Sequence, residues 1–211
     1  MLFTNFLPRG LVAAALISSV AGYAVDIEKR ALVTIGVRHM SRAEADATEA
    51  AGGLLVNIGG SGSQSQGGQL GNGKYVTTNT LAFAYEPWHA LVQADGSAFA
   101  DAKKVWVPEH VMLNGQKIYT HGNEFQVSRY VKACGGDPAT TIRMHVISTN
   151  PQFLIPDASV TTENPFAIKV KKAVKGMDQL PYTDIDMSTW HNILNPEMAN
   201  KNEDTQDRHV D

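Results

Sequence analysis

Arg38 stands at the end of an apolar, β-prone segment, and its surroundings in the sequence suggest a binding role. The segment Leu32–Val37 predicts a strand, and Ser41 and Glu44 have the S-x-x-E spacing of a capping box, which predicts the start of a helix. A guanidinium binds carboxylate or phosphate through a rigid planar fork, and a helix N-terminus adds unpaired N–H groups. Arg38 is therefore a candidate anion-binding residue; the alternative is an ordinary surface arginine.

A second set of residues could perform acid–base chemistry. Glu86 and His121 are a carboxylate and an imidazole that could exchange protons, and Lys104 lies between them in the sequence as a cation for a phosphate. Their order and spacing loosely resemble those of microbial guanyl-specific ribonucleases, which keeps RNA cleavage open as an alternative. The disulfides and the basic face of those enzymes are missing, which argues against it.

Metal-ligand patterns are absent from the sequence. The seven histidines are scattered, and none forms an H-x-x-x-H pair with a nearby carboxylate. Cys134 is the only cysteine, so an intramolecular disulfide is excluded and the core must supply the stability.

Composition gives the broad class. The chain has 211 residues, 43% of them hydrophobic and 18% charged, which fits one globular domain with a substantial core. The formal net charge of −3 gives no support for binding to nucleic acid or to an anionic membrane.

The N-terminus predicts secretion. Arg9 is followed by an uncharged, largely apolar run to Val25, with small residues around Gly22–Ala24. This pattern is typical of a secretory signal peptide, here residues 1–24, and is too short for a comfortable membrane span.

A dibasic pair, Lys29–Arg30, follows the predicted signal peptide. It resembles the processing site of kexin-type proteases in the yeast and fungal secretory pathway. We expect a short pro-segment over residues 25–30, a mature chain beginning at Ala31, and a secreted, extracellular protein from a fungus.

The rest of the chain predicts mostly strands and loops. The low-complexity segment Gly59–Gly73 predicts a flexible surface loop, Ala167–Lys175 fits either a strand or a helix, and the polar segment 195–211 predicts a frayed tail. A turn is expected near Asn114–Gly115, and a helical turn near 187–194. The expected strands are 74–80, 104–107, 116–120 and 140–148.

Several of these segments, taken in order, resemble the A subunits of the heat-labile enterotoxin and cholera toxin family of ADP-ribosyltransferases. Arg38 with its following helix resembles the family's opening strand, NAD-contacting arginine and first helix. Tyr75–Asn79 resembles the strand that carries a Ser-Thr-Ser motif. Ile142–Phe153 and Leu180–Ile185 resemble two later segments of the family.

The resemblance implies an α+β fold with two small packed β-sheets, flanking helices and a central cleft for NAD. It implies that Arg38, Thr77 and Thr78 contact NAD, which would be a substrate or a ligand. It also implies a single domain over residues 31–194, in which Ala82–Pro138 has no counterpart and is expected to be an insertion.

The family's catalytic Glu-x-Glu motif is missing. Counting back from Pro181 places Lys171 and Ala173 at the two glutamate positions, and the nearest upstream acid is Glu163, eight residues early. Cleavage of the bond between nicotinamide and ribose passes through an oxocarbenium-like state, which a carboxylate stabilises and a lysine does not.

Three interpretations follow. The first is a secreted toxin-type effector with reduced or lost catalysis, and the second is an active ADP-ribosyltransferase that uses Glu163 or another acid. The third is the ribonuclease-like protein described above. The sequence names no host target and shows no B subunit or membrane anchor, and no catalytic residue is assigned.

Overall fold

The computed structural model describes residues 31–56, 68–82, 86–160, 166, 168–171 and 173–210. The predicted signal peptide, the pro-segment with Lys29 and Arg30, and most of the predicted loop Gly59–Gly73 lie outside these residues.

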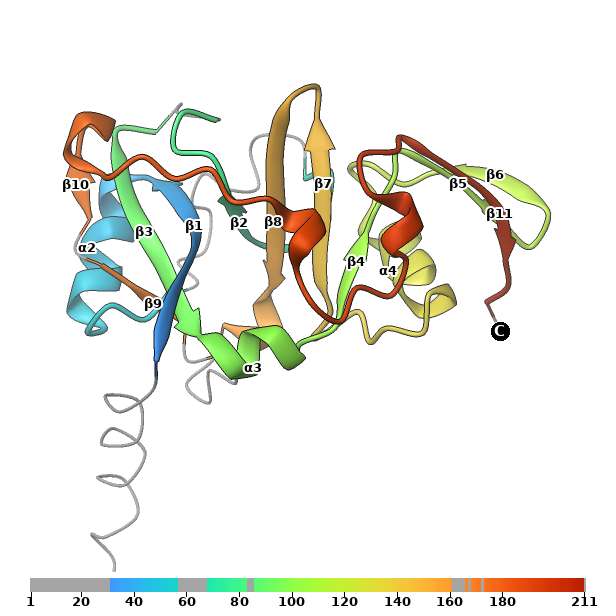
Figure 1. Ribbon diagram of the computed structural model, residues 1–211, viewed down its shortest axis with the longest axis horizontal. Helices are drawn as coiled ribbons and strands as arrows, with labels where there is room; N and C mark the ends of the chain where they lie inside the picture. The colour runs from blue at the N-terminus through green and yellow to red at the C-terminus, as the bar shows by residue number, and fades with distance from the viewer. Residues whose placement is uncertain are drawn as a thin grey trace, which may run out of the picture. The chain divides into compact units, whose positions relative to one another are not determined.

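A mixed sheet forms the centre of the fold (Figure 1). Its strands run in the order β10-β3-β1-β2-β8-β7-β4, and β9 also pairs with β3. All of these pairs are antiparallel except β4 with β7. The strands are β1 (Leu32–Met40), β2 (Gly73–Thr77), β3 (Trp88–Asp95), β4 (Lys104–Trp106), β7 (Ile142–Ile147), β8 (Asn150–Pro156), β9 (Lys169–Val170) and β10 (Val174–Lys175).

A three-stranded sheet lies beside the β4 end of the main sheet (Figure 1). It contains β5 (His110–Leu113), β6 (Gln116–Tyr119) and β11 (Glu203–Arg208) in the order β11-β5-β6. The turn between β5 and β6 has φ of +50° at Asn114 and +75° at Gly115, as the Asn-Gly pair predicts.

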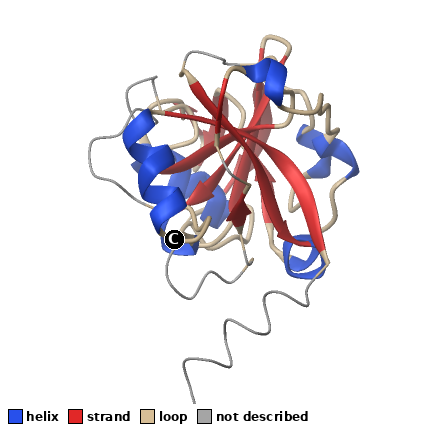
Figure 2. Cartoon of the chain, turned by 90° about the vertical axis from the view of Figure 1, so that its left-hand side faces the viewer, coloured by secondary structure: helices blue, strands red, loops and turns tan. Residues whose placement is uncertain are grey.

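Helices are few and short, and they lie on both sides of the strands (Figure 2). With two sheets and few helices, the fold is α+β, as expected, although the two sheets are unequal in size. The described helices are α2 (Arg42–Ala50), α3 (Gly96–Asp101) and α4 (Glu124–Ala133), with 3-10 turns η2 (Asp157–Ser159), η3 (Met177–Gln179), η4 (Met187–Thr189) and η5 (Pro196–Met198).

The main sheet is buried on both faces at its β8–β7–β4 side. Along β8, Phe153 and Ile155 belong to one hydrophobic cluster, and Leu154 between them belongs to a second. Successive side chains of a strand point to opposite faces, so the two clusters cover the two faces of the sheet. The second cluster includes Val127 and Val131 of α4.

The segment Ala82–Pro138, which is expected to be an insertion, contributes strands to the main sheet. It supplies β3, which pairs with β1 in register from Leu32↔Asp95 to Met40↔Trp88. It also supplies β4 of the main sheet. Because Ala90 and Val92 of β3 are completely buried, this segment belongs to the core of the domain.

The predicted frayed tail is also part of the fold. Asn195 is fully buried, and its side chain bonds both backbone groups of Trp106 at 2.9 and 2.8 Å. Residues 203–208 form β11, which pairs in parallel with β5. A polar composition suggested fraying, but the buried Asp204 accepts hydrogen bonds from Tyr130 and Arg208, which hold the segment in place.

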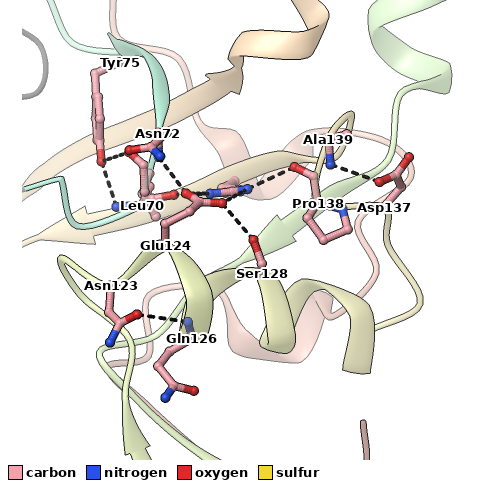
Figure 3. A network of polar contacts seen from close by, with 12 residues as sticks. Leu70, Asn72, Tyr75, Asn123, Glu124, Gln126, Ser128, Asp137, Pro138 and Ala139 are labelled. Atoms are coloured by element: carbon pink, nitrogen blue, oxygen red, sulfur yellow. Dashed lines mark hydrogen bonds and ion pairs between the residues drawn. The ribbon is translucent and has the colours of Figure 1, made fainter. Parts of the chain in front are cut away.

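An ion pair between a buried arginine and a half-buried glutamate joins α4 to the main sheet and to the residues before β2 (Figure 3). Arg143 of β7 donates two hydrogen bonds to Glu124, at 2.8 and 2.9 Å, and one to the carbonyl of Leu70 at 2.7 Å. Glu124 also accepts from the amide of Asn72 at 2.7 Å. A Cβ on Gly71 would overlap both charged groups, so the close approach requires glycine, which also has φ of +89° here.

We predict that Arg143→Met lowers the free energy of unfolding by about 2–4 kcal/mol, because Glu124 and the Leu70 carbonyl lose a buried donor. Urea denaturation measures the change. Arg129→Met is the matched control, since Arg129 of α4 contacts only residues of its own helix among those described, Gln126 and the Phe125 ring, and should change stability by less than about 0.5 kcal/mol. Equal effects of the two substitutions would contradict the structural role of Arg143.

Candidate functional site

The Arg38 side chain is buried and bonded to its own chain. Only 1% of the residue is exposed. Its Nε donates to Glu44 Oε1 at 2.7 Å, and its Nη2 lies 2.7 Å from the same oxygen. Its Nη1 donates to the backbone carbonyl of Tyr75 at 2.6 Å. Nε and Nη1 therefore have hydrogen-bond partners, whereas Nη2 is buried close to the Glu44 carboxylate without a hydrogen bond to any described residue.

Lys74 completes this buried group of charges. Its Nζ lies 3.6 Å from Glu44 Oε1, and the residue is 2% exposed. Burial lowers the pKa of Lys74, while Glu44 and Asp157 raise it and the Arg38 charge lowers it further. Glu44 thus stabilises two cations, on β1 and β2, from a position on α2.

The capping-box prediction was half right. Ser41 does cap α2, with its Oγ accepting from the amide of Glu44 at 3.2 Å. The Glu44 carboxylate instead binds Arg38 and Lys74 beneath the helix. Arg38 therefore lies in the interior, under α2, rather than at the helix N-terminus where the sequence suggested an anion-binding site.

Thr77 is the last residue of β2, the strand next to Arg38, since β1 and β2 pair at Val37↔Thr77, and Thr78 follows it. The Thr77 hydroxyl bonds the Pro151 carbonyl at 3.1 Å. Thr78 is completely buried, and its Oγ1 has no hydrogen-bond partner in the described part of the chain. The contacts of these two threonines and those of Arg38 are separate, so the structure places Arg38 on β1 and the threonines at the end of β2 without joining them in one polar network.

The end of β2 contacts the segment Leu180–Ile185. The amide of Ile185 donates to the Thr78 carbonyl at 3.1 Å, and the hydroxyls of Thr80 and Thr183 lie 2.8 Å apart. Two segments that the sequence separates by about a hundred residues therefore lie side by side.

The structure describes Lys171 and Ala173, the two positions expected for the catalytic glutamates, but it does not describe Glu163. Lys171 is exposed, and its amide donates to Leu91 at 3.0 Å. Ala173 is partly buried beside it. Glu163 lies outside the described residues, so its position is not assigned.

The three residues of the ribonuclease-like alternative do not share their contacts. Lys104 is fully buried, and its Nζ donates to the carbonyls of Phe99, Ala102 and His191 at 2.5, 2.9 and 3.2 Å. Burial lowers the pKa of Lys104 to about 8. Because three backbone carbonyls bind the Lys104 amino group, it is not free to bind a phosphate beside His121. The His121 ring packs against His145.

Two pairs of histidines are in contact that the sequence did not predict. His39 and His89 face each other across β1 and β3, with their Nδ1 atoms 2.6 Å apart. His121 and His145 have ring centroids 4.4 Å apart. Nothing in their sequence spacing indicates these contacts, because each pair joins residues of different elements. Among the described residues, no group of three or more His, Cys, Asp or Glu side chains could hold a metal ion.

Burial keeps these imidazoles neutral. Burial, and to a smaller extent the neighbouring His89 and His121, lower the pKa of His39 and of His145 to about 4. Hydrogen bonding to Ala82 and to Val107, respectively, opposes the shifts.

Two comparisons with known proteins bear on the site. A family model described as a family of unknown function (DUF5910) matches residues 68–195, which is more than half of the chain. No curated protein matches the chain. Within the described residues, no helix is long and apolar enough to cross a membrane.

We predict that Glu44→Gln lowers the free energy of unfolding by about 3–5 kcal/mol, because Arg38 and Lys74 would keep two buried positive charges without their shared carboxylate. Urea denaturation is again the measurement. Glu49→Gln on the exposed side of the same helix is the control, with an expected change below about 0.5 kcal/mol. A small effect at Glu44 would show that the buried charges do not depend on it.

We also predict that acid destabilises the protein through its buried histidines. In the unfolded chain a histidine is protonated below a pH of about 6.5. In the folded protein His39 and His145 stay neutral until the pH falls to about 4. The free energy of unfolding should therefore fall between these values by about 1.4 kcal/mol per pH unit for each of the two residues.

Denaturation at a series of pH values tests this dependence. The substitution His145→Phe should reduce the slope by about one proton, because the variant has no imidazole to titrate at that position. The substitution His191→Phe, at an exposed site, should leave the slope unchanged. A stability that stays constant from pH 6.5 to 4 would contradict the prediction.

Proposed function

Because the chain belongs to DUF5910, a family of unknown function, its own geometry has to suggest an activity, and we propose that it is a secreted, toxin-type effector that does not cleave NAD. In this proposal the domain keeps an ADP-ribosyltransferase-like fold and acts by binding a host protein. The identity of that host protein is left open.

The contacts of Arg38 are the observation that carries the proposal. The resemblance assigns this arginine to the NAD phosphates, but Glu44 and the Tyr75 carbonyl already occupy its guanidinium. A phosphate would have to displace a buried carboxylate, and separating a buried ion pair costs about 3–5 kcal/mol. We therefore assign Arg38 to holding α2 on the sheet.

The charges at the expected catalytic positions support the same conclusion. Lys171 and Ala173 stand where the resemblance requires two glutamates. A positive charge beside a developing oxocarbenium ion raises the barrier that a carboxylate would lower. The α+β fold and the contact between Thr78 and Ile185 support the fold assignment itself.

We predict that the secreted mature protein, incubated with NAD, releases no nicotinamide above the buffer rate. The melting temperature should also stay unchanged when NAD is added, since a ligand of the folded state would raise it. Nicotinamide release is measured by chromatography beside a Glu163→Ala variant. Turnover in the parent protein that this substitution abolishes would overturn the proposal and establish an active transferase.

A further inference from the structure

The outer edge of the three-stranded sheet is open. Strand β6 (Gln116–Tyr119) stands last in the order β11-β5-β6, and among the described strands it pairs only with β5 (Figure 1). Gln116, Lys117 and Tyr119 are exposed. The edge of a sheet presents unpaired N–H and C=O groups, to which a further strand can bond.

The backbone groups of Lys117 and Tyr119 point away from β5. The amide of Thr120, which follows β6, donates to the Glu109 carbonyl at 3.0 Å. Bonded and non-bonded pairs alternate along an antiparallel ladder, so Ile118 bonds β5, whereas Lys117 and Tyr119 on either side of it do not. Neither of these two backbones bonds any other group in the described part of the chain. Each residue therefore keeps a free N–H and a free C=O.

The other edges of the described sheets are closed. At β4 the amide of Leu194 donates to the Lys104 carbonyl at 2.9 Å, so another segment covers that edge. Strands β9 and β10 have only two residues each. Strand β11 is rich in charged residues, and its register with β5 is interrupted between Asp204 and Asp207. A cover, a short strand, charge and an irregular register are the usual means by which proteins prevent pairing at a sheet edge.

Strand β6 lacks these protections. Its four residues pair with β5 in unbroken register. Its one charged side chain, Lys117, forms an ion pair with Glu203 at 2.8 Å. Glu203 belongs to β11, on the far side of β5, so the lysine charge is directed away from the open edge. Strand β6 is therefore the described edge best suited to accept another strand.

The two faces of β6 determine which side chains an added strand presents. Ile118 packs on the hydrophobic cluster that includes Val111 and Val127. Tyr119 lies on the other face, where the centroid of its ring is 5.3 Å from that of His110. Because side chains alternate along a strand, those of an added strand lie in turn beside the apolar cluster and beside Tyr119. An extended segment in which every second residue is apolar fits this edge.

We propose that β6 binds an extended segment of a partner protein by antiparallel strand addition. The segment exchanges two backbone hydrogen bonds with Lys117 and two with Tyr119, and its apolar side chains lie beside Ile118. Antiparallel pairing is more stable per residue than parallel pairing. This proposal names a surface for the partner binding proposed above and rests on that function.

A second copy of the chain fits the edge less well than a different protein. Each copy would contribute a strand of only four residues, whereas stable protein interfaces bury roughly 800 Å² on each partner. A segment of another protein is not limited to the length of β6 and can continue over the neighbouring surface.

Amide hydrogen exchange, followed by NMR on the secreted protein, tests the proposal. The probe is a synthetic peptide, acetyl-Lys-Val-Thr-Val-Thr-Val-Lys-amide, whose valines face the cluster and whose threonines pair with Lys117 and Tyr119. Exchange of the Lys117 and Tyr119 amides should be fast in the free protein and slow by about tenfold or more with millimolar peptide. The Ile118 amide, already bonded to β5, should exchange slowly in both states.

The control peptide has the same sequence with both threonine nitrogens methylated. It keeps every side chain and loses the two donors, so it should leave the exchange of Lys117 and Tyr119 unchanged. Equal protection by the two peptides, or no protection by the first, overturns the proposal. Slow exchange of both amides in the free protein, together with a doubled molecular mass, would assign β6 to a second copy and also overturn it.

Two substitutions at one position separate backbone from side chain. Tyr119→Pro removes an outward N–H that β5 does not use, and an edge strand tolerates proline there, so it should weaken peptide binding by about tenfold or more. Tyr119→Ala keeps the N–H and should weaken binding by no more than about fivefold, the contribution of one cross-strand side-chain pair. Melting temperatures verify that both variants fold. Equal loss of binding in the two folded variants overturns the proposal.

The failure of this proposal and that of the proposed function can be told apart. Nicotinamide release measures catalysis, whereas amide protection measures strand addition at β6. Release of nicotinamide would overturn the proposed function and leave any protection of Lys117 and Tyr119 to be observed. Absent protection would overturn the role of β6 alone.

Discussion

The ion pair between Arg38 and Glu44 connects the three elements on which the N-terminal half of the domain depends. Arg38 lies on β1, Glu44 on α2, and the same guanidinium reaches the Tyr75 carbonyl on β2. Taking these charges out of water is costly, and their mutual attraction offsets the cost only when each polar atom has a partner. Helix α2 is therefore held by polar contacts beneath it as well as by the burial of Ala45.

A second ion pair has the corresponding role on the other side of the main sheet. Arg143 and Glu124 join β7 to α4, and through Leu70 and Asn72 they fix the residues that lead into β2 (Figure 3). In both pairs an arginine on a central strand meets a glutamate in the first turn of a helix. Each pair fixes how its helix lies on the sheet, because the planar guanidinium accepts a carboxylate in few orientations.

A small cavity beside α2 follows from this arrangement. The helix is held at its first turn by Glu44 and at its end by the bond from Val170 to Gly53. Between these two points the small side chains of Ala45 and Ala173 leave space. Lys171 lies exposed at the edge of this space.

Sequence alone determined the local features of this protein. The cap at Ser41, the turn at Asn114–Gly115 and the strand around Ile142–Ile147 follow from short-range rules of backbone geometry and hydrogen bonding. Tertiary structure decided which face of each element meets another. It paired Glu44 with Arg38, brought β3 into the core beside β1, and ordered the polar tail as β11. Those outcomes depend on contacts between residues that are far apart in the chain. The local sequence around a charged residue or a strand does not show which distant residue will bury it.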